Sequence, residues 1–504
     1  MRVRLLLAAL LLMPLVAVPA GAASGTRQPY LVVLPDGMGI ADGRAAVASA
    51  GGRVVEAIPE VGLLSVTADA TLPYRLRGAD VVRADALRPV ATLPDETPSA
   101  AAGRGGASEP LSAQQWGNQV VGATEDGSYR IELGDRRVAV GVLDSGIDAG
   151  HPDLSSIVDR ARSRTFARHM PDIDGPCPTP DCVSPPEEDP LGHGTHTAGV
   201  IAAARNGLGT AGVAPGVRLV SLRVAQDSGY VFPLPVVRAL VYSGYAGLNV
   251  VNMAFTLDPW LFHCAAHPDD TAEEQAEQRV MMTVIRRAVA FARSRGVLSV
   301  ASLGDQGADL GKPFLDDQSP TYPAGAVTPR QVDGACQVLP AETDGVLGVT
   351  RLGRDGGLGQ ASNFGLGAAD IAAPGGPGAT VTDRILAPYP ERAAIAQGMV
   401  GPDGAPVHPS LVRDCRDGVC GYYRYANLAS SFVSGVAALV VSRYGRPGRD
   451  GMTLDPATTE RILLRTARPV PCPDNTPACE GRPGANGFYG AGVVDAVAAL
   501  GGRR

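Results

Sequence analysis

The feature that most constrains the fold of this chain is a repeated alternation of short apolar runs with longer segments of helical character. Residues 138–143 are apolar throughout, which is typical of a strand that is buried on both faces. Alternating strands and helices favour an α/β fold, in which a parallel sheet carries helices on both faces. Functional residues in such sheets gather at the carboxyl ends of the strands. Further strands are expected at residues 219–224, 248–255 and 297–302, and helices at residues 193–204, 236–246 and 273–295.

A smaller α+β unit is expected ahead of this domain, within residues 25–94. Its short apolar runs indicate strands, and a segment that ends at two glycines indicates a helix. Residues 95–110 are small and polar without apolar periodicity, which predicts an exposed linker. The large domain is therefore expected to span residues 111–504. The strands of the small unit are expected at residues 30–34, 53–56 and 61–67, and its helix at residues 41–50.

The N-terminus indicates the compartment. Arg2 and Arg4 precede an apolar run at residues 5–18, and small residues of the A-x-A type follow it. This arrangement predicts a secretory signal peptide over residues 1–23. The alternative is an uncleaved membrane anchor, but the run is shorter than the roughly 20 residues that a span needs and Pro14 interrupts it. We expect a secreted, extracellular protein without a membrane partner.

The charge and the cysteines fit an exported protein. The 504 residues carry a formal net charge of −7, which argues against a nucleic-acid partner. Eight cysteines suit an oxidising compartment, although eight allow 105 pairings and pairing between neighbours is a hypothesis. The run from His263 to His267 contains Cys264 and offers zinc binding as an alternative, and we favour a disulfide. The neighbouring cysteines are Cys177 and Cys182, Cys415 and Cys420, and Cys472 and Cys479, which leave Cys264 and Cys336.

Two motifs contain the candidate catalytic residues. Asp144 follows the strand at residues 138–143 in the sequence VAVGVLDSGID, so it is expected at the carboxyl end of that strand. His193 lies between two glycines at a predicted helix start, in LGHGTHTAG, where little surrounds its side chain. Each residue alone is also consistent with a structural role, such as a turn or helix cap for Asp144. Together the two motifs are specific.

DSGID followed by GHGTHTAG resembles the subtilase family of serine proteases, and the resemblance covers residues 111 to about 500. It implies a subtilisin-like parallel sheet, and it implies that the small N-terminal unit is an inhibitory propeptide. The resemblance continues in GVAP at residues 212–215, VVNM at 250–253, SLGD at 302–305, YPA at 322–324, SNFG at 362–365, AAPG at 372–375, GVAAL at 435–439 and YGAGVVDA at 489–496.

The resemblance implies a secreted serine endopeptidase that hydrolyses protein or peptide substrates. In that chemistry a serine attacks the peptide carbonyl, a histidine takes its proton, and an aspartate holds the imidazole in the required tautomer. The aspartate and the histidine correspond to Asp144 and His193, whereas His196 is expected to be structural. No cofactor is expected to be required. Calcium often supports the family, and residues 187–189 form an acidic loop that could hold ligands or be a solvated charge run.

The nucleophile region departs from the family pattern G-T-S-M-A-x-P. Counting back from Gly435 without gaps puts Asn427 where the serine should be, with Leu428 and Ala429 matching Met-Ala. Counting forward from Cys420 and the tyrosines that follow it puts Ser430 there, which requires a deletion of nearly one helical turn after it. We favour Ser430 as the nucleophile.

Two further positions are altered. The family places an Asn side-chain donor in its oxyanion hole, and here that position is Asp305, which can donate only if protonated. Ala254 and Phe255, expected to bind substrate, stand where Ser-Leu is common. The alternative function is therefore a catalytically inactive relative that binds peptides or acts structurally. Residues 207–212 spell G-x-G-x-x-G, but they follow a helix and lead toward a strand, which excludes the dinucleotide-binding arrangement.

Overall fold

A seven-stranded parallel sheet forms the centre of the molecule, with the strand order β15-β14-β10-β8-β5-β7-β6. Every neighbouring pair in it is parallel. The computed structural model describes residues 27–76, 78–83, 109–170, 174, 176, 183–321, 326–376, 378–448 and 451–503. The predicted α/β fold class is confirmed. The strands are β5 (Ala139–Asp144), β6 (Arg164–Thr165), β7 (Arg218–Arg223), β8 (Val250–Met253), β10 (Leu298–Ser302), β14 (Val346–Leu352) and β15 (Ile371–Pro374).

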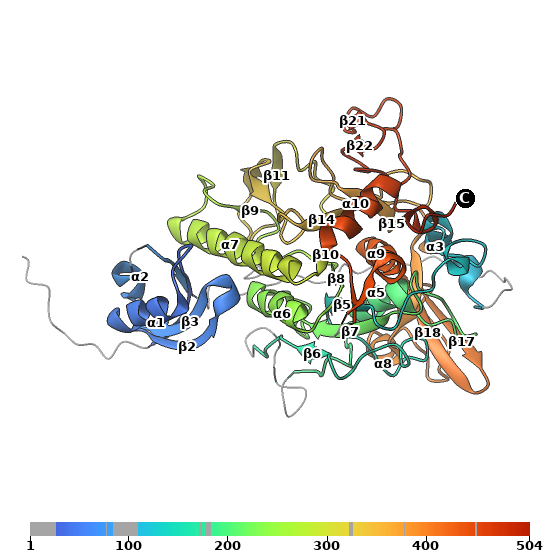
Figure 1. Cartoon of the computed structure of the whole chain (residues 1–504), viewed down its shortest axis with the longest axis horizontal. Helices are drawn as coiled ribbons and strands as arrows, with labels where there is room; N and C mark the ends of the chain where they lie inside the picture. The colour runs from blue at the N-terminus through green and yellow to red at the C-terminus, as the bar shows by residue number, and fades with distance from the viewer. Residues whose placement is uncertain are drawn as a thin grey trace, which may run out of the picture.

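Helices cover both faces of this sheet (Figure 1). Side chains of successive strand residues point to opposite faces, so β5 contributes Val140 to one core and Leu143 to the other. The first core lies under α5 (His193–Ala202) and α9 (Ser430–Tyr444), and the second under α6 (Pro233–Tyr245) and α7 (Ala272–Ser294). The other α-helices among the described residues of the large domain are α3 (Trp116–Val121), α8 (Glu391–Ala396), α10 (Pro456–Thr466) and α11 (Ala496–Ala499).

The element boundaries differ from the expected ones where the chain leaves the sheet. The strand expected at residues 248–255 is shorter, because β8 pairs with its neighbours only as far as Met253. The helix expected at residues 273–295 begins one residue earlier, at Ala272. A capping box fixes that start, in which Thr271 and Glu274 each accept a hydrogen bond from the other's backbone N–H.

The N-terminal unit is a small antiparallel sheet with the order β2-β3-β1-β4. It has its own apolar core, which includes Val32, Val47 and Leu64. The sequence did not predict α2 or β4, because α2 is a single turn and β4 has a charged residue at each end. Its elements are β1 (Gln28–Val33), α1 (Ile40–Ser49), β2 (Arg53–Ile58), β3 (Leu63–Ala68), α2 (Leu72–Arg75) and β4 (Asp80–Arg83).

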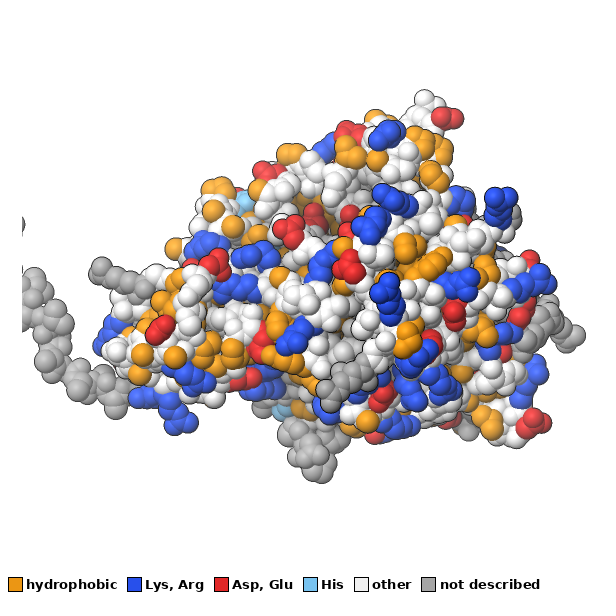
Figure 2. Space-filling view, in the orientation of Figure 1, with side chains coloured by type: hydrophobic (Ala, Val, Ile, Leu, Met, Phe, Trp, Pro, Cys, Tyr) orange, Lys and Arg blue, Asp and Glu red, His pale blue; other side chains and the backbone are white. Residues whose placement is uncertain are grey.

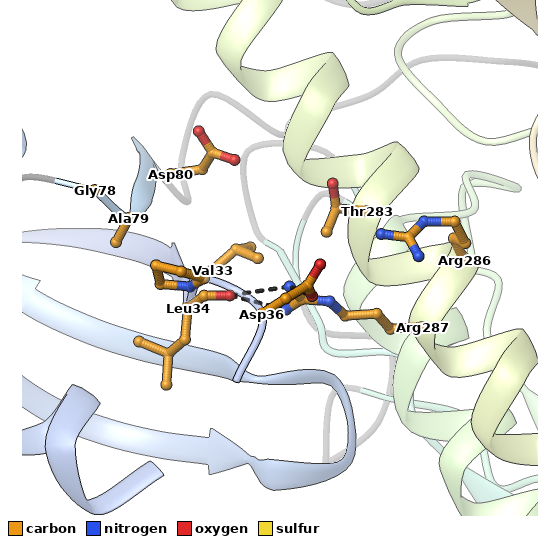
Figure 3. Close-up of a pocket in the computed structure, with 10 residues that line it drawn as sticks. Val33, Leu34, Asp36, Gly78, Ala79, Asp80, Thr283, Arg286 and Arg287 are labelled. Carbon is orange, nitrogen blue, oxygen red and sulfur yellow. Dashed lines mark hydrogen bonds and ion pairs between the residues drawn. The ribbon is translucent and has the colours of Figure 1, made fainter. Parts of the chain in front are cut away.

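This small unit packs against α6 and α7 of the large domain (Figure 1). Leu31 and Leu63 join the apolar core of those helices. Arg287 of α7 donates hydrogen bonds to the carbonyls of Leu34 (3.0 Å) and Val61 (2.9 Å), and it also pairs with a carboxylate of the small unit. Figure 3 shows Arg287 beside Leu34 and Asp36 at a pocket of about 490 Å³ between the two parts. The predicted signal peptide (residues 1–23) and residues 95–108 of the predicted linker lie outside the described residues.

Between β15 and α9 the chain forms a second antiparallel sheet with the order β16-β18-β17. Its strands are β16 (Ile385–Tyr389), β17 (Leu411–Arg416) and β18 (Val419–Ala426), and four two-stranded antiparallel sheets complete the described strands. These pairs are β9 (His263–Cys264) with β13 (Cys336–Gln337), β11 (Phe314–Asp316) with β12 (Arg330–Val332), β19 (Arg446–Gly448) with β20 (Gly451–Thr453), and β21 (Gly481–Arg482) with β22 (Ala485–Asn486).

Disulfides join Cys264 to Cys336, Cys415 to Cys420 and Cys472 to Cys479, as expected from the sequence. The bond at Cys264 excludes the zinc alternative for that thiol. Cys177 and Cys182 lie outside the described residues. The helices of the described chain include none long and apolar enough to cross a membrane. On the face seen in Figure 2, basic and acidic side chains are interspersed.

Candidate active site

Asp144 and His193 meet at the carboxyl edge of the parallel sheet. Asp144 is the last residue of β5, and His193 is the first residue of α5. The Nδ1 of His193 lies 2.8 Å from Oδ1 and 2.9 Å from Oδ2 of Asp144. The Asp144 side chain is 4% exposed, while that of His193 is 25% exposed, so the imidazole is the part of the pair that solvent can reach.

The electrostatics of this pair suit a proton acceptor. Burial disfavours the charged imidazole, but the adjacent Asp144 carboxylate, together with Asp189 and Asp305, raises the pKa of His193 above its usual value. A neutral ring that donates Nδ1–H to Asp144 keeps Nε2 as its proton acceptor. The hydroxyl of Thr197 also donates to Oδ2 of Asp144 at 3.2 Å, which helps to hold the carboxylate in place.

Close backbone packing explains why both motifs are rich in glycine. A Cβ on Gly194 would lie 2.0 Å from the carbonyl oxygen of Gly146, far inside van der Waals contact. Gly192 has a φ of +86°, and a Cβ there would lie 2.2 Å from the ring of Tyr389. The start of α5 can therefore approach the turn after β5 only because Gly194 lacks a side chain, and it can approach Tyr389 of β16 only because Gly192 lacks one.

His196 anchors α5 to the second sheet. Its Nε2 lies 2.9 Å from the carbonyl oxygen of Ile385 and 3.0 Å from that of Arg424. The ring is buried, and this burial lowers the pKa of His196 to about 4. These contacts give His196 a structural position on the helix that carries His193.

We expect the His196→Gln variant to lose less stability on acidification than the wild type. The folded state holds His196 neutral down to pH 4, whereas the unfolded chain protonates near pH 6.5. Stability from this group is therefore complete above pH 6.5 and is lost as the pH falls toward 4, by roughly 3 kcal/mol. A glutamine amide can donate to both carbonyls without titrating. Melting temperatures measured from pH 7.5 to 4 test this, and parallel curves for the two proteins would contradict it.

Asp305 lies in the loop after β10 and forms an ion pair that the sequence did not indicate. Nη1 of Arg351 lies 2.7 Å from Oδ1 of Asp305, and the side chains are 6% and 50% exposed. Arg351 belongs to β14 and packs beside the start of α9: a Cβ on Gly375 would touch both its Cγ (2.8 Å) and the Cβ of Ala429 (2.9 Å). Asp305 also contributes to the electrostatic field at His193. A buried guanidinium therefore occupies the neighbourhood of the expected oxyanion hole.

Ser430 is the first residue of α9, and its side chain is fully buried, as is that of Ser431. Neither hydroxyl has a hydrogen-bond partner among the described residues, so Ser430 makes no hydrogen bond with His193. Asn427 precedes the helix. It lies against the loop after β15, where a Cβ on Gly376 would be 2.8 Å from its Oδ1. The structure thus places Asn427 beside the loop that packs on Arg351.

The predicted substrate-binding residues Ala254 and Phe255 follow β8 directly and are half-buried. The next residue, Thr256, approaches the loop that carries Asp305, since a Cβ on Gly304 would be 3.4 Å from its Cγ2. This segment therefore runs beside the expected oxyanion position.

Asp189 is a residue of this site whose role the sequence did not reveal. Its side chain is buried, and its two oxygens accept hydrogen bonds from the Ser145 hydroxyl and from three backbone N–H groups at the start of α5. The available signal was an Asp shortly before a predicted helix, which is a capping pattern. The described residues contain no group of three or more His, Cys, Asp or Glu side chains suited to a metal ion, and calcium stays a prediction.

A parallel sheet with a buried aspartate and a histidine joined at its carboxyl edge defines the scaffold of a subtilisin-type serine protease. Comparisons with known proteins agree. Residues 135–492 match the model of the subtilase family, and the chain belongs to that family.

Similar proteins include fervidolysin from Fervidobacterium pennivorans, with 25% identity over 350 residues, which cover 67% of this chain and 39% of fervidolysin. The nisin leader peptide-processing serine protease of Lactococcus lactis is 27% identical over 337 residues, covering 66% of this chain and 44% of that protein. The matched region thus spans about two fifths of these relatives. The crystal structure of the epidermin leader peptide-processing serine protease from Staphylococcus aureus shares the fold, with a TM-score of 0.63 at 19% identity over 94% of this chain and 98% of that one.

Proposed function

We propose that this protein is an exported subtilase that holds polypeptide segments in its cleft and does not hydrolyse them. The observation that carries this proposal is the complete burial of Ser430, which has no hydrogen bond to His193. A nucleophile must reach both its general base and the substrate carbonyl, and a hydroxyl enclosed in the first turn of a helix reaches neither. The residue at the family's nucleophile position is then Asn427, whose amide is not nucleophilic.

The pairing of Asp305 with Arg351 supports the same proposal. An ionised carboxylate accepts hydrogen bonds and repels the negative charge that develops on a tetrahedral intermediate. Loss of one oxyanion donor alone lowers the rate by about 10²–10³. The pair keeps the Asp305 carboxylate within electrostatic reach of His193, because Arg351 is buried and needs its counter-charge.

The ligand class that we propose is an extended peptide segment of protein origin. Two of the similar proteins are named for processing a leader peptide, which is such a segment. The apolar, signal-like N-terminus and the disulfides support export. In this proposal the small N-terminal unit is a propeptide-like domain that packs on α6 and α7, and a role as intramolecular inhibitor belongs to the endopeptidase candidate below.

A fluorophosphonate probe tests the absence of a nucleophile. We expect no labelling of the purified wild-type protein and no cleavage of casein between pH 6 and 10, while a subtilisin treated in parallel is labelled and active. Fluorescence anisotropy of labelled casein peptides tests binding, and we expect saturable binding that an excess of unlabelled peptide displaces. Labelling that maps to Ser430 would overturn the proposal.

The second candidate is a serine endopeptidase that uses Asp144, His193 and Ser430. The intact hydrogen bond between Asp144 and His193 favours it, since that pair is the acid–base half of the triad. In this case Ser430→Ala and His193→Ala would each remove nearly all activity, and their effects would not add.

A further inference from the structure

Asp189 connects the two segments that carry Asp144 and His193. One oxygen accepts from the Ser145 hydroxyl at 2.8 Å and from the Gly192 N–H at 2.8 Å, and the other accepts from the Thr195 N–H at 2.8 Å. We propose that Asp189 is a positioning residue, which fixes the imidazole of His193 against Asp144 by tying the start of α5 to the turn after β5. This role does not depend on whether the protein hydrolyses the peptide that it binds.

Ser145 is the bridge in this arrangement. It follows Asp144 in the chain, and its backbone N–H donates to Oδ1 of Asp144 at 2.8 Å. Its hydroxyl donates to Asp189 and accepts from the N–H of Gly194, the residue after His193, at 3.0 Å. The neighbours of Asp144 and of His193 are thus joined through one hydroxyl, which lies closer to Asp189 Oδ1 (2.8 Å) than to Asp144 Oδ1 (3.2 Å).

Arg223 binds the same two backbone segments that Asp189 joins, the turn after β5 and the segment before α5. It ends β7 directly opposite Asp144 in the sheet, and its side chain is fully buried. Its guanidinium donates to the carbonyl oxygens of Ser145 (2.6 Å) and Glu188 (3.3 Å). The guanidinium therefore bonds to both backbone segments that Asp189 joins. It also provides positive charge near the buried Asp189 carboxylate.

The alternative role for Asp189, as part of a calcium-binding acidic loop, fits these contacts poorly. A cation ligand needs free lone pairs directed at the ion, but protein donors already occupy both oxygens of Asp189. Glu188 beside it is half exposed and pairs with Arg392 on α8 at 3.1 Å. Its carboxylate therefore serves as a matched control that takes no part in the hydrogen bonds of Asp189.

Side-chain ¹⁵N–¹H correlation spectra of the full-length protein test the proposal, with the His193 signals assigned through His193→Gln. We expect Asp189→Asn to remove the downfield Nδ1 proton resonance of His193 and to shift its titration to lower pH. Ser145→Ala should weaken the same resonance. Glu188→Gln, which removes an equal charge from the neighbouring residue, should leave the resonance in place.

A folded Asp189→Asn protein whose His193 resonance and titration match the wild type would overturn the proposal. If that variant does not fold, Ser145→Ala decides the question by the same resonance, because it removes the bridge and leaves the buried carboxylate with its backbone donors. An unchanged His193 resonance in folded Ser145→Ala would then contradict the positioning role of Asp189. If the wild-type protein does not bind peptides, but the His193 resonance changes in Asp189→Asn and Ser145→Ala as expected, the result contradicts the proposed function and leaves the role of Asp189 supported.

Discussion

The variant that combines Asn427→Ser, Asp305→Asn and Arg351→Met is expected to gain peptidase activity over the wild type by at least about 10³-fold. It supplies a hydroxyl at the position that the ungapped count assigns to the nucleophile, and an amide donor at the oxyanion position. The Asp144–His193 pair needs no change, since its hydrogen bond of 2.8 Å is already formed. Cleavage of a fluorogenic peptide library and fluorophosphonate labelling at position 427 measure the gain.

Arg351 has to change together with Asp305. Its side chain is 6% exposed, and its guanidinium loses its counter-charge when Asp305 becomes neutral. An unpaired buried charge destabilises a protein by about 3–5 kcal/mol, so Asp305→Asn alone is expected to lower stability before it affects the rate. Methionine matches much of the length of the arginine stem without the charge.

Two control variants separate the candidate functions. Asp305→Asn with Arg351→Met, but with Asn427 kept, should stay inactive if Asn427 occupies the nucleophile position. If Ser430 is the nucleophile, the same double variant should instead gain about 10²–10³-fold, and Ser430→Ala should abolish that gain. His193→Ala in the triple variant should return its activity to background.

The four adjacent strands β10, β8, β5 and β7 and the Asp144–His193 pair were predictable because local features encode them, whereas β6, β14 and β15 were not predicted. Each central strand is an apolar run, and the two motifs contain the glycines that the close approach of α5 to β5 requires, such as Gly194. The strand ends were less predictable, since β8 stops at Met253 where pairing with its neighbours ends, although the apolar run continues to Phe255. Hydrophobicity sets burial there, and the partner strands set the length.

The ion pairs were not predictable, because they join residues distant in sequence. Arg351 stands in a strand of otherwise mostly apolar residues, and nothing near it indicates a contact with Asp305. In the sequence Asp189 belongs to an acidic run shortly before a predicted helix, and neither feature separates it from Glu188; in three dimensions its oxygens accept from backbone N–H groups at the start of α5, whereas Glu188 is half exposed. A local pattern cannot separate two adjacent carboxylates that the fold turns to opposite sides.

A second buried network, remote in sequence from the catalytic motifs, surrounds Arg330 of β12. Its side chain is 1% exposed, and it pairs with Asp270 at 2.7 Å and with Asp316 at 3.3 Å, which are 4% and 0% exposed. The guanidinium also lies 4.4 Å from the ring centroid of Trp260. One cation thus compensates two buried carboxylates and holds together the segments before α7 and around the hairpin of β11 and β12.

Arg330→Met is expected to lower the free energy of unfolding by about 3–5 kcal/mol, because it leaves Asp270 and Asp316 buried without a counter-charge. Urea unfolding at pH 7 measures the loss. Adding Asp270→Asn and Asp316→Asn to the same chain should recover part of the lost stability, since the uncompensated charges are then removed.

Arg354→Met is the matched control. Arg354 is 50% exposed, its partner Asp383 lies 3.6 Å away, and a surface pair of this kind contributes at most about 1 kcal/mol. Equal losses for Arg330→Met and Arg354→Met would show that the buried network does not stabilise the fold, and a loss in the triple variant as large as in Arg330→Met would assign the effect to packing.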